Sequence, residues 1–338
     1  MLDKSIKIKN KYSLYMLITF CIAASLCCTS RTGEQHTIIF ATFAEQEAQL
    51  NNILLMAKSI RTFAGQHRNA PIWLYIPTSL GEEKFRIWEQ LANFNVNIKT
   101  SETPQDAIWY YFARKVFAAA QAEAEADGRT EILAWLDEDT IVLQEPSEFI
   151  LAKGKALGYR PVMHKNIGLL YTGPVDLFWS RAYNIMSVSE SSLFPMVTPA
   201  DGDTIRPYFN AGCMIVRPKQ FTLRKWAEYF TLLYQDSVLS EMCKQDVYKR
   251  IFIHQAALTG AIVNYLARDE ITQLSDRINY PIFFKQMFGS KREFNNISDV
   301  ITFRHESYFR NPAPDWYEKL RGPADKITWL KEQLDNRN

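Results

Sequence analysis

No glycine-rich phosphate-binding loop, of either the P-loop or the dinucleotide type, occurs in this sequence. Proteins that hold nucleotides by such loops are therefore not indicated. The body of the chain also lacks runs of lysine and arginine, and its formal net charge is only +2. Because a nucleic-acid-binding surface needs a concentrated basic patch, we expect no nucleic acid partner.

Internal repeats and low-complexity segments are also absent. Hydrophobic residues make up 47% of the chain and aromatic residues 13%, which is ample for a sizeable core and excludes global disorder. A chain of 338 residues can form one large α/β domain or two small ones.

Cysteine is scarce, and only Cys213 and Cys243 lie beyond the N-terminal segment. In an exported chain these two could form a disulfide. Cys213, however, lies in an apolar run, where most cysteines are small core side chains. Both alternatives stay open because the sequence does not give the separation of the two Cα atoms.

The first 31 residues have the character of a targeting segment. A basic start precedes an apolar run over 12–28, and small residues follow it as at a signal-peptidase site. The run is at the short limit for a membrane span, so a cleaved signal peptide is favoured over a signal anchor. Lipidation of Cys27 or Cys28 is a third alternative. We expect an exported or membrane-associated protein, in a bacterial periplasm or outer membrane or in a eukaryotic secretory lumen.

Hydrophobic periodicity in the first half predicts strands that alternate with helices. The strands are expected over 37–43, 71–76, 96–98 and up to residue 137, and the helices over 51–63, 82–94 and 107–126. Such alternation implies a parallel sheet with right-handed crossovers.

The pattern is less regular after residue 149. Strands are expected over 157–162, 211–216 and 300–305, and helices over 221–234, 255–265 and 323–336. The irregular stretch 168–206 is long for a compact domain, and such stretches are often functional. We expect a domain over 32–322, followed by a polar C-terminal helix within 323–338.

The most informative stretch is 132–143, where an apolar run leads into Asp137 and Asp139. The run predicts a buried strand, which puts both carboxylates at the carboxyl edge of the sheet, where α/β proteins bind ligands. Two like charges this close are costly to bury unless a positive group lies between them. A divalent cation that prefers oxygen ligands, Mg²⁺ or Mn²⁺, is the simplest such group. Acidic residues also follow strands for solvation alone, so downstream motifs must decide.

Three downstream motifs follow in order: Tyr-Phe-Asn-Ala-Gly and an apolar strand over 208–216, His-Gln-Ala-Ala-Leu over 254–258, and His-Glu-Ser-Tyr-Phe-Arg over 305–310. With them the chain resembles GT-A-type nucleotide-sugar glycosyltransferases of family 8, the branch of glycogenin and the bacterial lipopolysaccharide galactosyltransferases. The resemblance covers about residues 37–312. It implies an α/β fold with a Rossmann-like mixed sheet flanked by helices.

The resemblance also implies a metal site and residues at the donor sugar. Asp137, Asp139 and His305 would ligate Mn²⁺ or Mg²⁺, which neutralises the diphosphate leaving group. Asn210 would hydrogen-bond the donor sugar, and Gln255 would act at the reacting face of the sugar.

Further residues are implied along the donor. Ala41, Thr42 and Phe43 would lie at the nucleotide, together with Tyr111 and Arg114 on the helix before the acidic motif.

Two more positions concern the diphosphate. Arg310 would bind it, since a guanidinium suits phosphate. Gly212 would permit close approach of the backbone at the donor.

We therefore expect a metal-dependent glycosyltransferase that moves a sugar from a nucleotide-diphospho-sugar, a UDP-sugar, to a glycan or glycolipid with retention of configuration. One alternative is an exported GT-A-like protein that binds glycans or nucleotides without turnover. It stays open because His254 and Ala256 flank Gln255, where the family commonly has Asp; His254 could instead be a surface residue at a helix start. A nucleotidyltransferase is a third alternative, which would show a glycine-rich loop after the first strand.

Overall fold

The structure is a computed structural model that describes residues 36–81, 86–281, 296–305 and 321–335. The predicted targeting segment, with Cys27 and Cys28, and the predicted phosphate ligand Arg310 lie outside these residues. None of the described helices is both long and apolar enough to cross a membrane.

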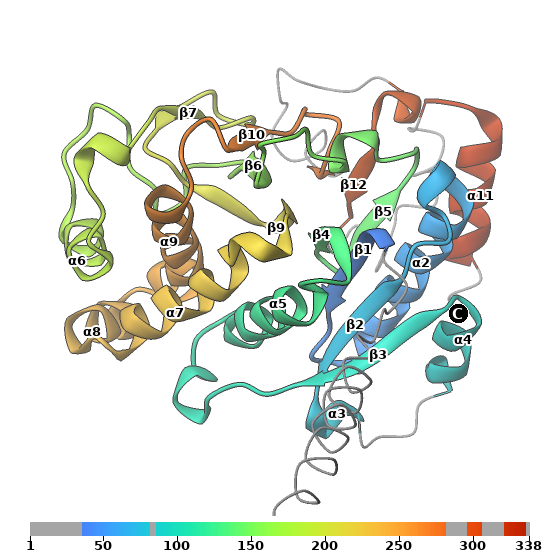
Figure 1. Ribbon diagram of the computed structural model, residues 1–338, viewed down its shortest axis with the longest axis horizontal. Helices are drawn as coiled ribbons and strands as arrows, with labels where there is room; N and C mark the ends of the chain where they lie inside the picture. Colours follow the sequence, from blue (N-terminus) through green and yellow to red (C-terminus); the bar gives the residue numbers. More distant parts are fainter. Residues whose placement is uncertain (1–35, 82–85, 282–295, 306–320, 336–338) are drawn as a thin grey trace, which may run out of the picture. The chain divides into compact units, whose positions relative to one another are not determined.

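A seven-stranded mixed sheet forms the centre of the described chain, in the order β10-β6-β9-β4-β1-β2-β3 (Figure 1). The four strands from the first half run parallel, as the alternation of strands and helices predicts. β9 is antiparallel to both β4 and β6, which makes the sheet mixed. The strands are β1 (His36–Phe43), β2 (Ile72–Pro77), β3 (Val96–Ser101), β4 (Thr130–Leu136), β6 (Leu157–Pro161), β9 (Phe209–Val216) and β10 (Ile271–Gln273).

Helices cover both faces of this sheet. Along β1, Ile39 and Ala41 belong to one core, while Ile38 and Phe40 belong to the other, because successive side chains point to opposite faces. The first core is closed by α5 (Ala113–Ala126), α6 (Leu177–Met186), α7 (Thr222–Gln235), α8 (Ser237–Gln245) and α9 (Val247–Tyr265). The second is closed by α2 (Glu47–Phe63) and α4 (Ile87–Asn93), with the short α3 (Thr78–Gly81) after β2. Burial on both faces explains why the central strands are apolar throughout. The predicted α/β fold with a mixed sheet flanked by helices is confirmed.

A smaller sheet brings the end of the chain to the acidic motif. It joins β11 (Tyr280–Pro281), β12 (Thr302–Arg304) and β5 (Thr140–Val142). β12 runs antiparallel to β5, so that Arg304 pairs with Thr140. A two-stranded sheet of β7 (Met196–Val197) and β8 (Thr204–Ile205) lies within the irregular stretch.

The C-terminal helix α11 (Ala324–Asp335) lies beside α2 (Figure 1). Leu330 is fully buried, and the ring of Trp329 packs edge-on against Phe63 at 5.0 Å. The helix expected over 323–336 therefore forms, and its apolar side contributes to a third core instead of standing apart as a polar tail.

Two helix starts differ from the expected ones. α5 begins at Ala113, not at residue 107, because Phe112 adopts a left-handed backbone (φ 62°) that interrupts the helix. α9 begins at Val247, not at residue 255, because the Asp246 side chain accepts hydrogen bonds from the backbone N–H groups of Tyr248 and Lys249. Gln255 thus lies inside a helix and Tyr111 lies outside one.

Both cysteines of the described chain are buried and free, so the disulfide alternative is wrong. Cys213 faces the second core from β9, and Cys243 faces the first core from α8. They are small core side chains.

Candidate active site

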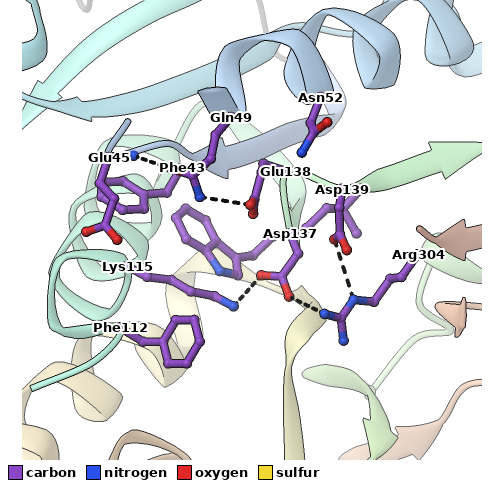
Figure 2. Close-up of a pocket in the computed structure, with 12 residues that line it drawn as sticks. Phe43, Glu45, Gln49, Asn52, Phe112, Lys115, Asp137, Glu138, Asp139 and Arg304 are labelled. Atoms are coloured by element: carbon purple, nitrogen blue, oxygen red, sulfur yellow. Dashed lines mark hydrogen bonds and ion pairs between the residues drawn. The ribbon is translucent and has the colours of Figure 1, made fainter. Parts of the chain in front are cut away.

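The acidic motif opens into a pocket at the carboxyl end of β4 (Figure 2). Asp137 and Asp139 line this pocket, whose volume is about 280 Å³. The backbone N–H of Asp137 donates to the carbonyl oxygen of Gly212 at 2.9 Å, which continues the pairing of β4 with β9. Strand pairing therefore fixes the backbone position from which the two carboxylate side chains extend.

Gly212 leaves the space that the Asp137 carboxylate fills. A Cβ atom at this position would lie 2.2 Å from Asp137 Oδ2, which is far inside van der Waals contact. Asn210, two residues earlier, is buried, and its Oδ1 accepts from the backbone N–H of Gly212 at 2.7 Å. The Asn279 side chain donates to the same oxygen at 3.4 Å. The Asn-Ala-Gly segment of β9 thus packs against the Asp137 carboxylate.

Two cationic side chains hold the acidic pair. Lys115 on α5 donates to Oδ1 of Asp137. Arg304 at the end of β12 lies between the two carboxylates: its Nη2 is 3.6 Å from Asp137 Oδ2, and its Nε is 3.5 Å from Asp139 Oδ1 (Figure 2). Burial by itself would raise the pKa of Asp137, but the charges of Lys115 and Arg304 outweigh it and hold that pKa below its ordinary value.

Neither cation was among the predicted site residues. Lys115 stands next to the predicted Arg114, and Arg304 stands next to the predicted His305. A basic residue that precedes the late histidine was the available signal for Arg304. The sequence alone could not show that it reaches two carboxylates from a separate strand.

Glu138, between the two aspartates, has a different environment. Its Oε1 accepts a hydrogen bond from the Gln49 side chain on α2 at 2.8 Å. Burial, and then the charges of Asp137 and Asp139, raise the pKa of Glu138 to about 7. The acidic turn therefore places Asp137, whose pKa is lowered, next to Glu138, whose pKa is raised to about 7.

His305 adjoins the acidic pair through the backbone. Its N–H donates to the carbonyl oxygen of Asp139 at 3.1 Å, and its side chain is buried. Within the described residues, however, no group of three His, Cys, Asp or Glu side chains is arranged to hold a metal. The predicted ligands are brought together, with Arg304 between the two carboxylates.

Gln255 and His254 lie on α9, in its buried part. Gln255 Oε1 is buried and has no hydrogen-bond partner among the described residues. His254 is buried too, so its alternative as a surface residue is wrong. Burial, and then the charge of Lys115, lower the pKa of His254 to about 3, and its Nδ1 lies 2.7 Å from the carbonyl oxygen of Ile251. The imidazole is neutral at physiological pH.

The predicted nucleotide residues divide into two groups. Phe43 lines the pocket, whereas Ala41 and Thr42 are fully buried in β1 and do not line it. Tyr111 is exposed in the turn before α5. Arg114 Nε lies 3.8 Å from a carboxylate oxygen of Glu45, which lines the pocket, but Arg114 itself does not.

Chemically, this arrangement suits a ligand that develops negative charge. Lys115 and Arg304 are cations that line the pocket, and the acidic pair supplies oxygen ligands of the kind that divalent metals prefer. Phe43 and Phe112 add apolar wall.

The match to a sequence family identifies the chain as a glycosyltransferase. The chain belongs to the family described as the Rhodobacterales glycosyltransferase domain, which matches residues 40–265. The match includes the acidic pair, Asn210 and Gln255. β12, with Arg304, and His305 lie beyond it. Membership of this family sets aside a nucleotidyltransferase.

Several solved glycosyltransferase structures align with the chain. The galactosyltransferase LgtC in complex with donor and acceptor sugar analogs is 16% identical, over 88% of this chain and 94% of that chain, with a TM-score of 0.41. Mouse xyloside xylosyltransferase 1 is 12% identical, over 81% and 98%, with a TM-score of 0.42. Core-mannan synthase A from Aspergillus fumigatus, in a Mn/GDP form, is 8% identical, over 72% and 74%, with a TM-score of 0.42. No curated protein sequence matches the chain. The family assignment rests on the sequence match alone.

Proposed function

We propose that this glycosyltransferase moves a sugar from a nucleotide-diphospho-sugar, specifically a UDP-sugar, to a glycan or glycolipid acceptor. The observation that carries the proposal is the convergence of Lys115 and Arg304 on the acidic pair within one pocket. Cleavage of the bond between sugar and diphosphate puts negative charge on the leaving group. Cations and a bound metal in the pocket would stabilise that charge.

The chemistry of the donor set suits Mn²⁺ or Mg²⁺, although the side chains are not arranged around a common centre in the described residues. Asp137 and Asp139 present carboxylate oxygens into the pocket, and His305 is hydrogen-bonded to the backbone of Asp139. These three residues would hold the cation, which when bound neutralises the diphosphate as a Lewis acid. Arg304 must then leave the position that it takes between the two carboxylates.

Retention of configuration is the outcome that the neighbourhood of Gln255 supports. An inverting reaction needs a base that takes the proton of the acceptor hydroxyl. His254, adjacent to Gln255, has its pKa lowered to about 3, first by burial, and such a group is a poor base at neutral pH. Asn210 and Gln255 are buried and do not line the pocket; if the donor sugar reaches them, their amides would orient it and stabilise charge without taking a proton.

A sugar acceptor is supported by aromatic rings beside the pocket. We call Trp109, Tyr111 and Phe112 the aromatic shelf; each is nearly half exposed, and Phe112 also lines the pocket. Arg250 stacks on Trp109 at 4.8 Å and on Tyr111 at 5.1 Å, which holds both rings in place. Exposed, rigid rings are suitable for stacking against the apolar face of a sugar. The N-terminal segment would export or anchor the enzyme where such acceptors occur.

A binding protein without turnover is the second candidate. It is favoured by one observation, since the residues on either side of Gln255 are buried and neither is a carboxylate. The two candidates agree on binding and differ in catalysis.

Thermal unfolding with UDP and Mn²⁺ tests binding first. The midpoint should rise as each ligand exceeds its dissociation constant. Asp139→Asn should abolish the part of the rise that depends on Mn²⁺, whereas Asp201→Asn should not, because Asp201 bonds His164 and does not line the pocket. No shift with any nucleotide would contradict both candidates.

Turnover then separates the enzyme from the binding protein. A panel of UDP-sugars is incubated with the full chain and Mn²⁺, and release of UDP is measured. Release that is lost in Asp139→Asn supports the transferase. Binding of UDP without release from any sugar, with or without glycan acceptors, supports the binding protein.

A further inference from the structure

Arg304 takes the place between the carboxylates that a metal would occupy. Its Nε and Nη2 lie 3.5 Å from Asp139 and 3.6 Å from Asp137 respectively. The other oxygen of Asp137 accepts from Lys115. Two carboxylates thus face two cations, and the charges of these four side chains sum to zero. A metal ion that approaches this group therefore meets two cations as well as the two carboxylates.

The contacts of Arg304 with the acidic pair are loose. Charge-assisted hydrogen bonds between nitrogen and oxygen are typically about 2.7–2.9 Å long, and both separations exceed this. The backbone of Arg304 is fixed by pairing with Thr140, whereas the end of its side chain lines the pocket. The guanidinium can therefore change partners while β12 stays in place.

A diphosphate is the partner that a guanidinium prefers. Arg presents a planar set of N–H donors that matches two phosphate oxygens at once. The pocket holds this group beside Lys115 and at the position where the proposed metal must bind. If Arg304 moves onto the incoming diphosphate, its guanidinium binds phosphate oxygens beside Lys115 and leaves the position where the proposed metal must bind.

We propose that Arg304 is a diphosphate-binding residue that exchanges partners, from the acidic pair in the free enzyme to the leaving group in the donor complex. The inference rests on the proposed function. The exchange frees Asp137 and Asp139 for the metal at the moment when the diphosphate arrives. Metal and nucleotide consequently bind with positive coupling, and each raises the affinity of the other by the same factor.

Calorimetric titration of the full chain with MnCl₂, in the absence and presence of saturating UDP, tests the exchange. For the wild type we expect weak binding of Mn²⁺ alone and binding at least about tenfold tighter with UDP. Arg304→Gln should bind Mn²⁺ alone more tightly than the wild type, bind UDP more weakly, and lose most of the coupling. Arg304→Lys should keep the weak binding of Mn²⁺ alone, because lysine keeps the positive charge. It should still bind UDP more weakly than the wild type, because lysine lacks the planar set of N–H donors.

Arg277→Gln is the matched control. It removes the same charge from a side chain that donates to the carbonyl oxygen of Asp299 and does not line the pocket, so all three quantities should match the wild type. The exchange is overturned if Arg304→Gln leaves Mn²⁺ affinity and coupling unchanged, or if the wild type binds Mn²⁺ equally with and without UDP. Absence of UDP binding by the wild type under every condition would overturn the proposed function as well, and is distinguishable on that ground.

Discussion

The backbone N–H of His305 donates a hydrogen bond to the carbonyl oxygen of Asp139 at 3.1 Å. This bond continues the antiparallel pairing of β12 with β5 and places Arg304 and His305 beside the acidic turn. Two parts of the chain far apart in sequence are thereby combined in one pocket.

Gly212→Ala should disable the pocket through a collision with Asp137. The added Cβ would lie 2.2 Å from Asp137 Oδ2, so the carboxylate must leave Lys115 or the strand must shift. We expect UDP affinity, measured by calorimetry with Mn²⁺, to fall at least tenfold. Gly154→Ala is the control: it has open space but a positive φ of 84°, so it should cost about 1 kcal/mol of stability and leave UDP binding unchanged. Equal UDP affinity in Gly212→Ala and the wild type would contradict the proposed position of Asp137.

Lys115→Gln should weaken both the fold and the site. It removes a cation from a buried carboxylate, a loss that typically costs about 3–5 kcal/mol, although Arg304 remains near Asp137 and reduces it. Urea denaturation should show the loss of stability, and UDP affinity should fall. Lys99→Gln breaks the more exposed pair with Glu125 and should cost less than about 1 kcal/mol. If the two variants lose the same free energy of unfolding, the prediction that burial strengthens the contribution of the Lys115–Asp137 pair is wrong.

Glu123→Gln should change how stability depends on pH. Glu123 is fully buried on α5 and accepts from the backbone N–H groups of Leu223 and Arg224 at the start of α7. Burial raises its pKa from an ordinary 4.5 to about 7 in spite of these bonds. Because the folded-state pKa is the higher one, the contribution to stability is complete below pH 4.5 and is lost as pH rises through 7.

Glutamine removes this titration. The stability of Glu123→Gln relative to the wild type should therefore increase from pH 5 to pH 8, by at most about 3 kcal/mol, in urea denaturation at each pH. Glu125→Gln should show a change of relative stability with pH of the opposite sign. Burial of Glu125 is outweighed by hydrogen bonds from Lys99 and Gln121, so its pKa is lowered. Its contribution to stability is therefore lost as pH falls. A difference for Glu123→Gln that does not vary with pH would refute the prediction.

Substitutions in the aromatic shelf should affect the acceptor and spare the donor. Trp109→Ala and Tyr111→Ala should each raise KM for a glycan acceptor by up to about tenfold, since one stacked ring contributes about 0.5–1.5 kcal/mol. Hydrolysis of the UDP-sugar in the absence of acceptor should keep its rate. Phe221→Ala is the matched control, because Phe221 is also exposed and stacked by an arginine, Arg224, yet follows β9 at its other end. An increase in KM for the UDP-sugar instead would assign the shelf to the donor.

The local sequence pattern was sufficient to predict those parts of the fold in which consecutive residues are buried. The strand that precedes Asp137 could be predicted because both of its faces are covered, which makes the run apolar. The start of α9 was missed because the Asp246 cap lies before the apolar period begins. The start of α5 was missed because nothing in the sequence marks Phe112 as left-handed, a conformation that a bulky residue seldom adopts.

The acidic residues of the site could be predicted from the sequence, whereas its two cationic residues could not. Asp137 and Asp139 could be identified because they directly follow a recognisable strand. Arg304 and Lys115 reach them from β12 and α5, and such a pairing depends on tertiary arrangement, which no local pattern encodes. The prediction that a positive group must separate the acids was physically sound, but the group observed there is a guanidinium.

The two cysteines of the described fold allow local opening of the core to be detected by labelling of their thiols. Burial raises the pKa of the Cys213 thiol and of the Cys243 thiol to about 12, so neither forms thiolate while the core is closed. One sits under each helical layer of the central sheet. A maleimide added to the native chain would label them only when a layer separates, and mass mapping would show which layer loosens first.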